Sequence, residues 1–227
     1  MALNLESIRA ICFDVDGTLS DTDDQLIAKL EKWLSPLCLL CPAEKLHNLA
    51  RRLVIVLENP VNVIYQLADK VGLDNYFAHI YSKFSRRAKR RSVRHTFLLI
   101  SGVREMLVKL IGKYKIAIVS ARGEKSTREF LKDFNLEEFF NVVVTARTCY
   151  YTKPFPDPIL YAAGIMGVEP SECLMVGDTV LDIKAGKRAG TQTVGVLCGF
   201  GVEREFLRAG ADLILNSTPE IVKVILP

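Results

Sequence analysis

The sequence predicts an α/β fold, namely a Rossmann-like parallel sheet with helices on both faces and an all-helical cap domain inserted after the first strand. Short apolar runs rich in β-branched residues recur at wide spacing, and helical patterns lie between them. The runs are apolar throughout, which is typical of parallel strands buried on both faces. One interval, residues 21–95, breaks the alternation because it has helical periodicity and no strand pattern.

Six short runs are the expected strands of the core, which we expect to comprise residues 1–19 and 97–227. The strands are Ala10–Phe13, Ile116–Val119, Val142–Thr145, Cys173–Val176, Thr193–Leu197 and Leu213–Leu215. The expected helices are Glu124–Phe134, Pro158–Met166, Thr179–Ala189 and Glu203–Arg208. Pro158 suits the first position of a helix, and Gly190 suits the residue that ends one.

The cap is expected to span residues 20–96. Its apolar residues follow helical spacing, with one face formed by Leu26, Leu30, Trp33 and Leu34 and another by Val63, Ile64, Leu67 and Val71. Three prolines, at positions 36, 42 and 60, divide the interval into about four helices.

The composition is that of an ordinary soluble globular protein, since 49% of the 227 residues are hydrophobic and 25% are charged. The longest apolar runs, such as Leu53–Leu57, are too short to span a bilayer, and residues 1–10 lack a signal-peptide pattern. We therefore expect a cytoplasmic protein with no membrane partner. Disulfides are not expected there, and the single C-x-x-C pair, Cys38 and Cys41, lacks the second pair that a zinc site would need.

Two aspartates directly follow the first expected strand, in the stretch Asp14-Val15-Asp16-Gly17-Thr18. Ligands of an open α/β sheet collect beyond the carboxyl ends of its strands, so both carboxylates would face a site. Such a pair suits Mg²⁺, and one member can attack phosphorus while the other transfers a proton. The Thr18 hydroxyl suits a phosphate oxygen. A turn that merely caps the strand would explain Asp16 and Gly17 but not Asp14, whose burial is costly without a partner.

Two further candidates follow later in the chain. Ser120 ends the run Ile116–Val119 and offers a hydroxyl for a phosphate oxygen, although a serine there is also an ordinary helix cap. Lys153 lies in a loop with three prolines within five residues. Because prolines stiffen a loop, this lysine would lose less entropy on holding an anion than a lysine on a solvated surface.

Asp178 and Asp182 follow the run Cys173–Val176. They are four residues apart, so with a helix starting between them both carboxylates would face the same cavity. The alternative is structural: Asp178 would cap the helix, and Asp182 would interact favourably with its dipole.

Together these residues resemble the four motifs of the haloacid dehalogenase superfamily, in the order Asp14/Asp16, Ser120, Lys153 and Asp178/Asp182. The resemblance covers residues 8–20 and 97–227. A cap between the first and second motifs is similar to that of the subfamily that contains phosphoglycolate phosphatases, small-molecule pyrophosphatases and β-phosphoglucomutases.

The resemblance implies a role for each residue. Asp14 would be the nucleophile that forms an aspartyl-phosphate, and Asp16 would protonate the leaving oxygen and then activate water. Ser120 and Lys153 would hold the phosphate. Mg²⁺ would be bound by Asp14, by the backbone carbonyl of Asp16 and by Asp178, with Asp182 supporting. These parts supply the nucleophile, charge neutralisation and positioning that phosphoryl transfer needs.

Positive charge gathers in the expected cap, where residues 20–96 hold 13 Lys and Arg against 8 Asp and Glu. The run Lys83–Arg94 has seven basic residues and no acid. We interpret it as a solvated helix face, with attraction of anionic substrates as the alternative. Nucleic acid is not expected, because stacking aromatics are not interleaved with the charges. Arg51, Arg52 and Arg122 are further candidate neighbours of a bound phosphate.

The sequence therefore predicts a Mg²⁺-dependent phosphatase acting on a small phosphorylated metabolite. Phosphoglucomutase-type transfer and pyrophosphate hydrolysis are alternatives that would use the same core residues. A non-catalytic binding protein on this fold would have no need of both aspartates of the first motif. Neither the substrate nor an oligomeric state is specified by these residues.

Overall fold

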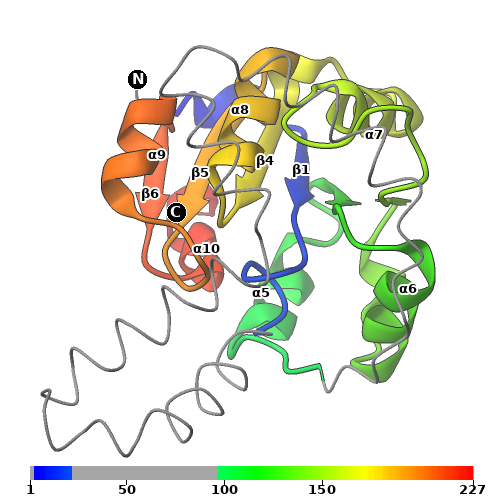
Figure 1. Cartoon of the computed structure of the whole chain (residues 1–227). Helices are drawn as coiled ribbons and strands as arrows, with labels where there is room; N and C mark the ends of the chain where they lie inside the picture. Colours follow the sequence, from blue (N-terminus) through cyan, green and yellow to red (C-terminus); the bar gives the residue numbers. More distant parts are fainter. Residues whose placement is uncertain (1–2, 22–96, 227) are drawn as a thin grey trace, which may run out of the picture. The chain divides into compact units, whose positions relative to one another are not determined.

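A computed structural model describes residues 3–21 and 97–226 of the protein, and in them a single parallel sheet is the central layer (Figure 1). The strand order is β3-β2-β1-β4-β5-β6. The strands are β1 (Ala10–Phe13), β2 (Lys115–Val119), β3 (Val142–Val144), β4 (Cys173–Gly177), β5 (Gln192–Val196) and β6 (Leu213–Leu215). The α-helices of the described residues are α5 (Val103–Leu110), α6 (Glu124–Asp133), α7 (Asp157–Met166), α8 (Val180–Ala189), α9 (Glu203–Ala209) and α10 (Ile221–Ile225).

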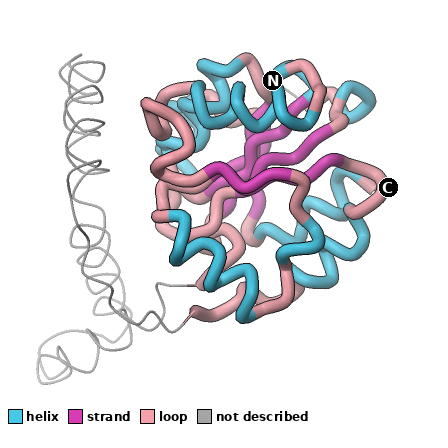
Figure 2. Tube along the Cα trace, turned by 90° about the vertical axis from the view of Figure 1, so that its right-hand side faces the viewer, coloured by secondary structure: helices cyan, strands magenta, loops and turns pink. Residues whose placement is uncertain are grey.

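The predicted α/β core is confirmed. All six expected strands form, with ends that differ by one residue at most, and helices cover both faces of the sheet (Figure 2). The four expected helices also form, and Gly190 ends α8 in the left-handed conformation, with φ 79°. Helices α5 and α10 were not predicted. The expected cap, residues 20–96, lies almost entirely outside the described residues.

The strand order brings the chain's polar motifs to one edge of the sheet. Strands β2 and β3 are added in turn on one side of β1, and β4 then pairs with the other side of β1. Phe13 pairs in register with Ile118 of β2 and with Val176 of β4. The residues just beyond these strands therefore meet where the direction of winding reverses, which is where open α/β sheets bind ligands.

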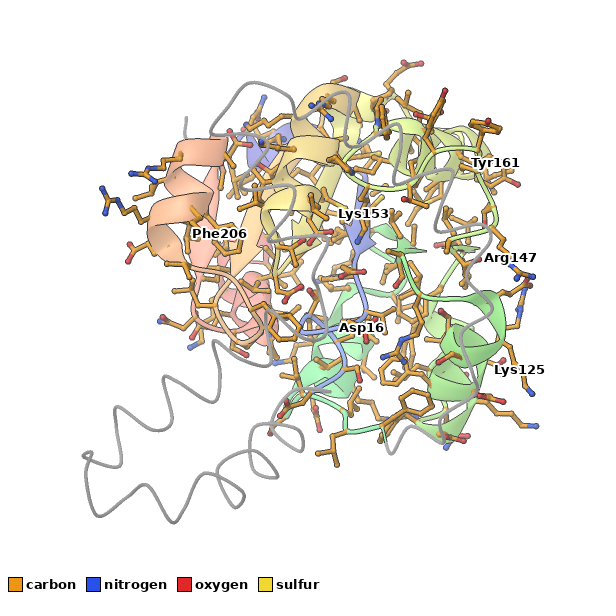
Figure 3. The ribbon with its side chains drawn as sticks, in the orientation of Figure 1. Asp16, Lys125, Arg147, Lys153, Tyr161 and Phe206 are labelled. Atoms are coloured by element: carbon orange, nitrogen blue, oxygen red, sulfur yellow. The ribbon has the colours of Figure 1, made fainter. Side chains whose placement is uncertain are left out.

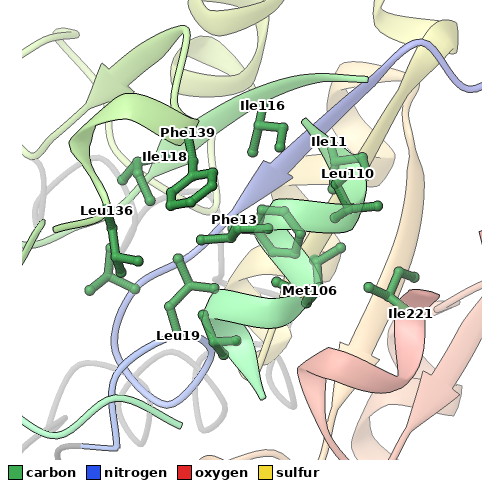
Figure 4. Close-up of a cluster of buried hydrophobic side chains, with 14 of the residues drawn as sticks. Ile11, Phe13, Leu19, Met106, Leu110, Ile116, Ile118, Leu136, Phe139 and Ile221 are labelled. Atoms are coloured by element: carbon green, nitrogen blue, oxygen red, sulfur yellow. The ribbon is translucent and has the colours of Figure 1, made fainter. Parts of the chain in front are cut away.

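The two faces of the sheet are packed differently. One face carries large side chains, including Phe13, Ile116 and Ile118, under α5, α6 and α10 (Figure 4). The other carries small ones, such as Ala10 and Ala117, under α7 and α8. A Cβ atom on Gly186 of α8 would lie 2.5 Å from the Thr193 side chain, so α8 needs glycine there to pack this close to the sheet. This close packing sets the first turn of α8 directly beside the end of β4.

No helix within residues 3–21 and 97–226 has both the length and the apolar character needed to cross a membrane.

Candidate active site

The loop after β1 is a tight turn that places Asp14 over the sheet edge. The Asp14 N–H donates to the Val176 carbonyl at 3.0 Å, and the Val15 carbonyl accepts from the N–H groups of Leu19 and Ser20. Gly17 has φ 70°, and a Cβ atom there would lie 2.2 Å from Oδ2 of Asp178. Both the left-handed backbone and this close approach require glycine at position 17.

Three buried carboxylates meet at the carboxyl ends of β1 and β4. Asp14, Asp178 and Asp182 each present an oxygen, and these oxygens all lie within 4.8 Å of one another. Lys153 joins them, since its Nζ is 2.8 Å from Oδ1 of Asp14 and 2.6 Å from Oδ1 of Asp182. All four side chains are nearly inaccessible to solvent. Residues from three separate motifs of the sequence thus form one cluster.

Burial dominates the electrostatics of this cluster. It raises the pKa of Asp14 to about 6, an effect that Lys153 opposes and that the charges of Asp182 and Asp16 reinforce. For Lys153, burial alone would lower the pKa, but the charges of Asp14 and Asp182 outweigh it and raise the pKa above its usual value. Lys153 therefore remains an ammonium ion at neutral pH, held between two carboxylates.

Two of the carboxylates are held by the start of α8 and by the loop after β5. Asp182 accepts hydrogen bonds from the Thr179 N–H and hydroxyl, at 2.9 and 2.6 Å, in a capping box. Thr179, rather than Asp178, is the N-cap residue. Asp178 accepts from the Phe200 N–H at 2.8 Å, and the Thr18 hydroxyl lies 3.4 Å away. Asp182 therefore has both of the roles considered from the sequence, since it stabilises the start of α8 and also belongs to the carboxylate cluster.

Asp16 lies at the more open side of the site and is paired with Arg122. Nε of Arg122 donates to Oδ2 of Asp16 at 3.0 Å, and Nη2 donates to Oδ1. The Asp16 side chain is 38% exposed, whereas that of Arg122 is 9% exposed. Figure 3 labels Asp16 and Lys153, and both lie close to the segment that carries β1 and the loop after it.

Ser120 and Lys153 both sit where the sequence predicts. Ser120 is buried just beyond the end of β2, and its Oγ accepts from the Arg122 N–H at 3.1 Å. The proline-containing loop that carries Lys153 is held by α8, because Nη1 of Arg188 donates to the Pro154 carbonyl at 3.1 Å. The candidates Arg51 and Arg52, the basic run Lys83–Arg94 and the Cys38–Cys41 pair lie outside the described residues.

Sequence reasoning missed the loop after β5, residues 197–201. Besides the Phe200 N–H, this loop brings Sγ of Cys198 to 3.4 Å from the Gly17 carbonyl. A Cβ atom on Gly199 would lie 2.2 Å from Oδ2 of Asp178. The stretch Cys198-Gly199-Phe200-Gly201 begins two residues after the end of β5. Two glycines so close to the carboxyl end of a strand are the signal that would have identified this loop as part of the site.

Comparison with known proteins agrees with this geometry. The family model described as haloacid dehalogenase-like hydrolase matches residues 11–196, which is most of the chain. The chain belongs to this family. It is therefore a haloacid dehalogenase-like hydrolase, and the predicted resemblance is confirmed.

Two relatives of this hydrolase and one solved structure illustrate the similarity. A phosphoglycolate phosphatase of Aquifex aeolicus is 34% identical over 202 residues, covering 85% of this chain and 86% of the relative. Pyrophosphatase PpaX of Bacillus velezensis is 31% identical over 191 residues, covering 83% of each. The crystal structure of a predicted phosphoglycolate phosphatase from Haemophilus somnus aligns with a TM-score of 0.62 at 22% identity, over 96% of this chain and 98% of the other.

The cluster also suits a divalent cation. Asp14, Asp178 and Asp182 carry three formal negative charges and Lys153 one positive charge, which leaves −2 in a buried volume. Among the described residues, Oδ1 of Asp14 has the ion pair with Lys153 but no hydrogen bond of ordinary geometry. Carboxylate oxygens are the ligands that Mg²⁺ prefers, and a divalent ion would balance this charge.

Proposed function

We propose that this hydrolase is a Mg²⁺-dependent phosphatase that cleaves small phosphate monoesters through an aspartyl-phosphate on Asp14. The observation that carries the proposal is the buried cluster of Asp14, Asp178, Asp182 and Lys153 at the point where the winding of the sheet reverses. Its net negative charge would be unfavourable without a cation, and its one lysine is placed to hold a phosphate next to Asp14.

In the first half-reaction, an oxygen of Asp14 attacks phosphorus and forms a new P–O bond. The bond between phosphorus and the ester oxygen breaks, and Asp16 gives its proton to that leaving oxygen. In the second, water attacks the phosphoryl group on Asp14 and passes a proton to Asp16. The P–O bond to Asp14 breaks, so the products are an alcohol and phosphate and both aspartates are restored.

Asp14, Asp178 and the Asp16 carbonyl would hold the metal, with Asp182 at the back of the site. When bound, Mg²⁺ supplies charge stabilisation for the transferring phosphoryl group. Lys153 and Ser120 hold phosphate oxygens, and Lys153 also reduces the repulsion between the phosphate and Asp14. Thr18 borders the same site through its contact with Asp178.

The two relatives named above support small anionic substrates. One relative is named for phosphoglycolate and the other for pyrophosphate. Pyrophosphate hydrolysis is accordingly our second candidate function, since breaking an anhydride requires the same nucleophile and the same metal. We propose that the metabolite is a small phosphorylated compound of this kind.

The test is a phosphate-release screen over phosphoglycolate, pyrophosphate and sugar phosphates, with Mg²⁺ and with a chelator. We expect release that requires Mg²⁺ and that Asp14→Asn abolishes by a factor of about 10³ or more. Asp133→Asn, which changes an exposed carboxylate on α6, is the matched control and should leave activity unchanged. Substantial turnover by folded Asp14→Asn protein would contradict the mechanism, and conversion of a sugar phosphate to its isomer without net release would point to phosphoryl transfer instead.

A further inference from the structure

The pair formed by Arg122 and Asp16 is the strongest feature of the site that the proposed mechanism does not use. Two of the three guanidinium nitrogens donate to the two Asp16 oxygens, in the bidentate arrangement that gives an arginine–carboxylate pair directional strength. Arg122 is buried, whereas Asp16 is partly exposed. The buried partner is thus anchored in the protein, and it determines where the more exposed carboxylate points.

Arg122 is itself held from several directions. Its guanidinium carbon lies 4.9 Å from the ring centre of Phe97 and 6.0 Å from that of Phe130. These two rings contact each other edge to face, with centres 5.7 Å apart. The Arg122 N–H donates to Oγ of Ser120, as described above. Contacts with ring faces and a buried backbone restrict the rotamers of the arginine before any substrate is bound.

We propose that Arg122 is a positioning residue that orients Asp16 for both proton transfers, a role that rests on the proposed phosphatase mechanism. A carboxylate has about four lone-pair sites, and Arg122 uses one on each oxygen. One of the remaining sites accepts the proton from water in the second half-reaction, and that same proton passes to the leaving oxygen in the next turnover. A general acid–base group contributes about 10²–10⁴ in rate, and that contribution depends on holding it within hydrogen-bonding reach of the reacting oxygen.

This proposal differs from the role that the sequence predicts for Arg122, which is contact with the bound phosphate. Its Nη1 is buried and lacks a hydrogen-bond partner among the described residues, so that nitrogen is the group a substrate anion would use. The two roles predict different kinetics. A positioning residue affects the proton-transfer steps, whereas a substrate ligand affects KM and every ester alike.

The test compares p-nitrophenyl phosphate, whose leaving group needs no proton, with phosphoglycolate, whose leaving group does. With Arg122→Gln and p-nitrophenyl phosphate, we expect a first-turnover burst of nitrophenol within about threefold of the wild-type rate. Steady-state turnover should then be about 30- to 100-fold slower, because water activation is impaired. With phosphoglycolate the first turnover itself should slow by a similar factor, and KM should stay within about twofold.

Three more variants sharpen the result. Arg122→Lys keeps the charge but loses the bidentate geometry, so it should be intermediate, about tenfold slower. Arg128→Gln, at an exposed arginine on the neighbouring helix α6, is the matched control and should match wild type. When Arg122→Gln is added to Asp16→Asn, it should cost less than about twofold more, because the arginine acts through a carboxylate that is already absent.

A tenfold rise in KM, an equal first-turnover loss with both esters, or additive effects in the double variant would each overturn the proposal. Thermal unfolding and circular dichroism establish that Arg122→Gln is folded. Phe97→Leu, which leaves the ion pair but removes one ring, should show the same pattern at a loss of about three- to fivefold. If the wild-type enzyme releases phosphate from neither ester nor from pyrophosphate, the proposed function fails, which is a different outcome from the failure of the Arg122 role alone.

Discussion

At the scale of single residues, the burial of Asp14, which we propose as the nucleophile, opposes folding. Its folded pKa of about 6 lies above the ordinary value near 4, so the metal-free folded state retains a proton that the unfolded state has already lost. Stability therefore falls as pH rises from about 4 to 6 and remains reduced above that. The two-unit difference corresponds to about 3 kcal/mol at neutral pH.

We predict that Asp14→Asn stabilises the metal-free protein at pH 7.5 by up to about 3 kcal/mol, because the amide carries no charge to bury. The gain should shrink through pH 6 and vanish below about pH 4, where both states are protonated. Urea unfolding across this pH range in the presence of a chelator measures it. Asp133→Asn should change stability by less than about 0.5 kcal/mol at every pH. A destabilised Asp14→Asn protein at pH 7.5 would show that the ion pair with Lys153 outweighs the cost of burial.

At the scale of elements, the loop after β5 packs against Asp178 of the carboxylate cluster. We predict that Gly199→Ala raises the Mg²⁺ concentration for half-maximal activity about tenfold, since its Cβ would lie 2.2 Å from Oδ2 of Asp178 and 2.6 Å from the Gly17 carbonyl. One of these groups must move to admit the methyl group. A Mg²⁺ titration of phosphate release measures the change.

The control for this loop is Gly164→Ala on α7, where no atom lies within 4 Å of the added Cβ. It should leave Mg²⁺ activation unchanged and stabilise the helix by roughly 0.5–1 kcal/mol. If Gly199→Ala binds Mg²⁺ like wild type, Asp178 tolerates displacement, and its place in the cluster would have to be reconsidered.

Helix α8 supports the site through a second element, the loop that carries Lys153. We predict that Arg188→Gln lowers kcat/KM about three- to tenfold, because the hydrogen bond to the Pro154 carbonyl limits movement of that loop. Arg208→Gln on α9, which changes an exposed arginine of similar helical position, should have no effect. Steady-state kinetics on both variants decide whether the Pro154 contact matters to the site.

At the scale of the whole molecule, the elements that the sequence predicts best are those with a strong local pattern. Every expected strand forms, and each is a short run rich in apolar and β-branched residues that begins directly after a polar residue. Helix α5 was not predicted, because its apolar residues, such as Val103 and Leu107, come soon after the apolar run at residues 97–100, and the two together obscure a helical period. Helix α10 has five residues, which is too short for a helical period to show.

In the candidate site, too, the residues predicted correctly are those with a strong local sequence pattern. Asp14, Ser120 and Asp178 each follow the end of a strand, and β1 lies between β2 and β4, so local sequence was enough to predict that they lie at the same edge of the sheet. The Asp16–Arg122 pair joins residues 106 positions apart. Its geometry depends on Phe97 and Phe130, which are unremarkable aromatics in the sequence and acquire a role only through packing. Long-range pairing of side chains was therefore the part that sequence patterns did not reveal.

Because the carboxylate cluster joins β1, β4 and α8, metal binding should stabilise the whole core. A ligand at 100 times its Kd stabilises the folded state by about 2.7 kcal/mol. For a protein of this size that is a rise in Tm of about 5–10 °C. We predict such a rise when Mg²⁺ is added at pH 7.5, and no rise for Asp178→Asn, which removes one of the carboxylate charges.

The gain in Tm should be smaller at pH 5 than at pH 7.5. At pH 5 most of the metal-free protein has a protonated Asp14, because its pKa is about 6, and the metal must displace that proton. Thermal shift titrations with Mg²⁺ at both pH values measure the difference, and KCl at matched ionic strength controls for general salt effects. An equal rise at both pH values would mean that Asp14 is not a ligand, and an equal rise with KCl would mean that no specific metal site contributes to stability.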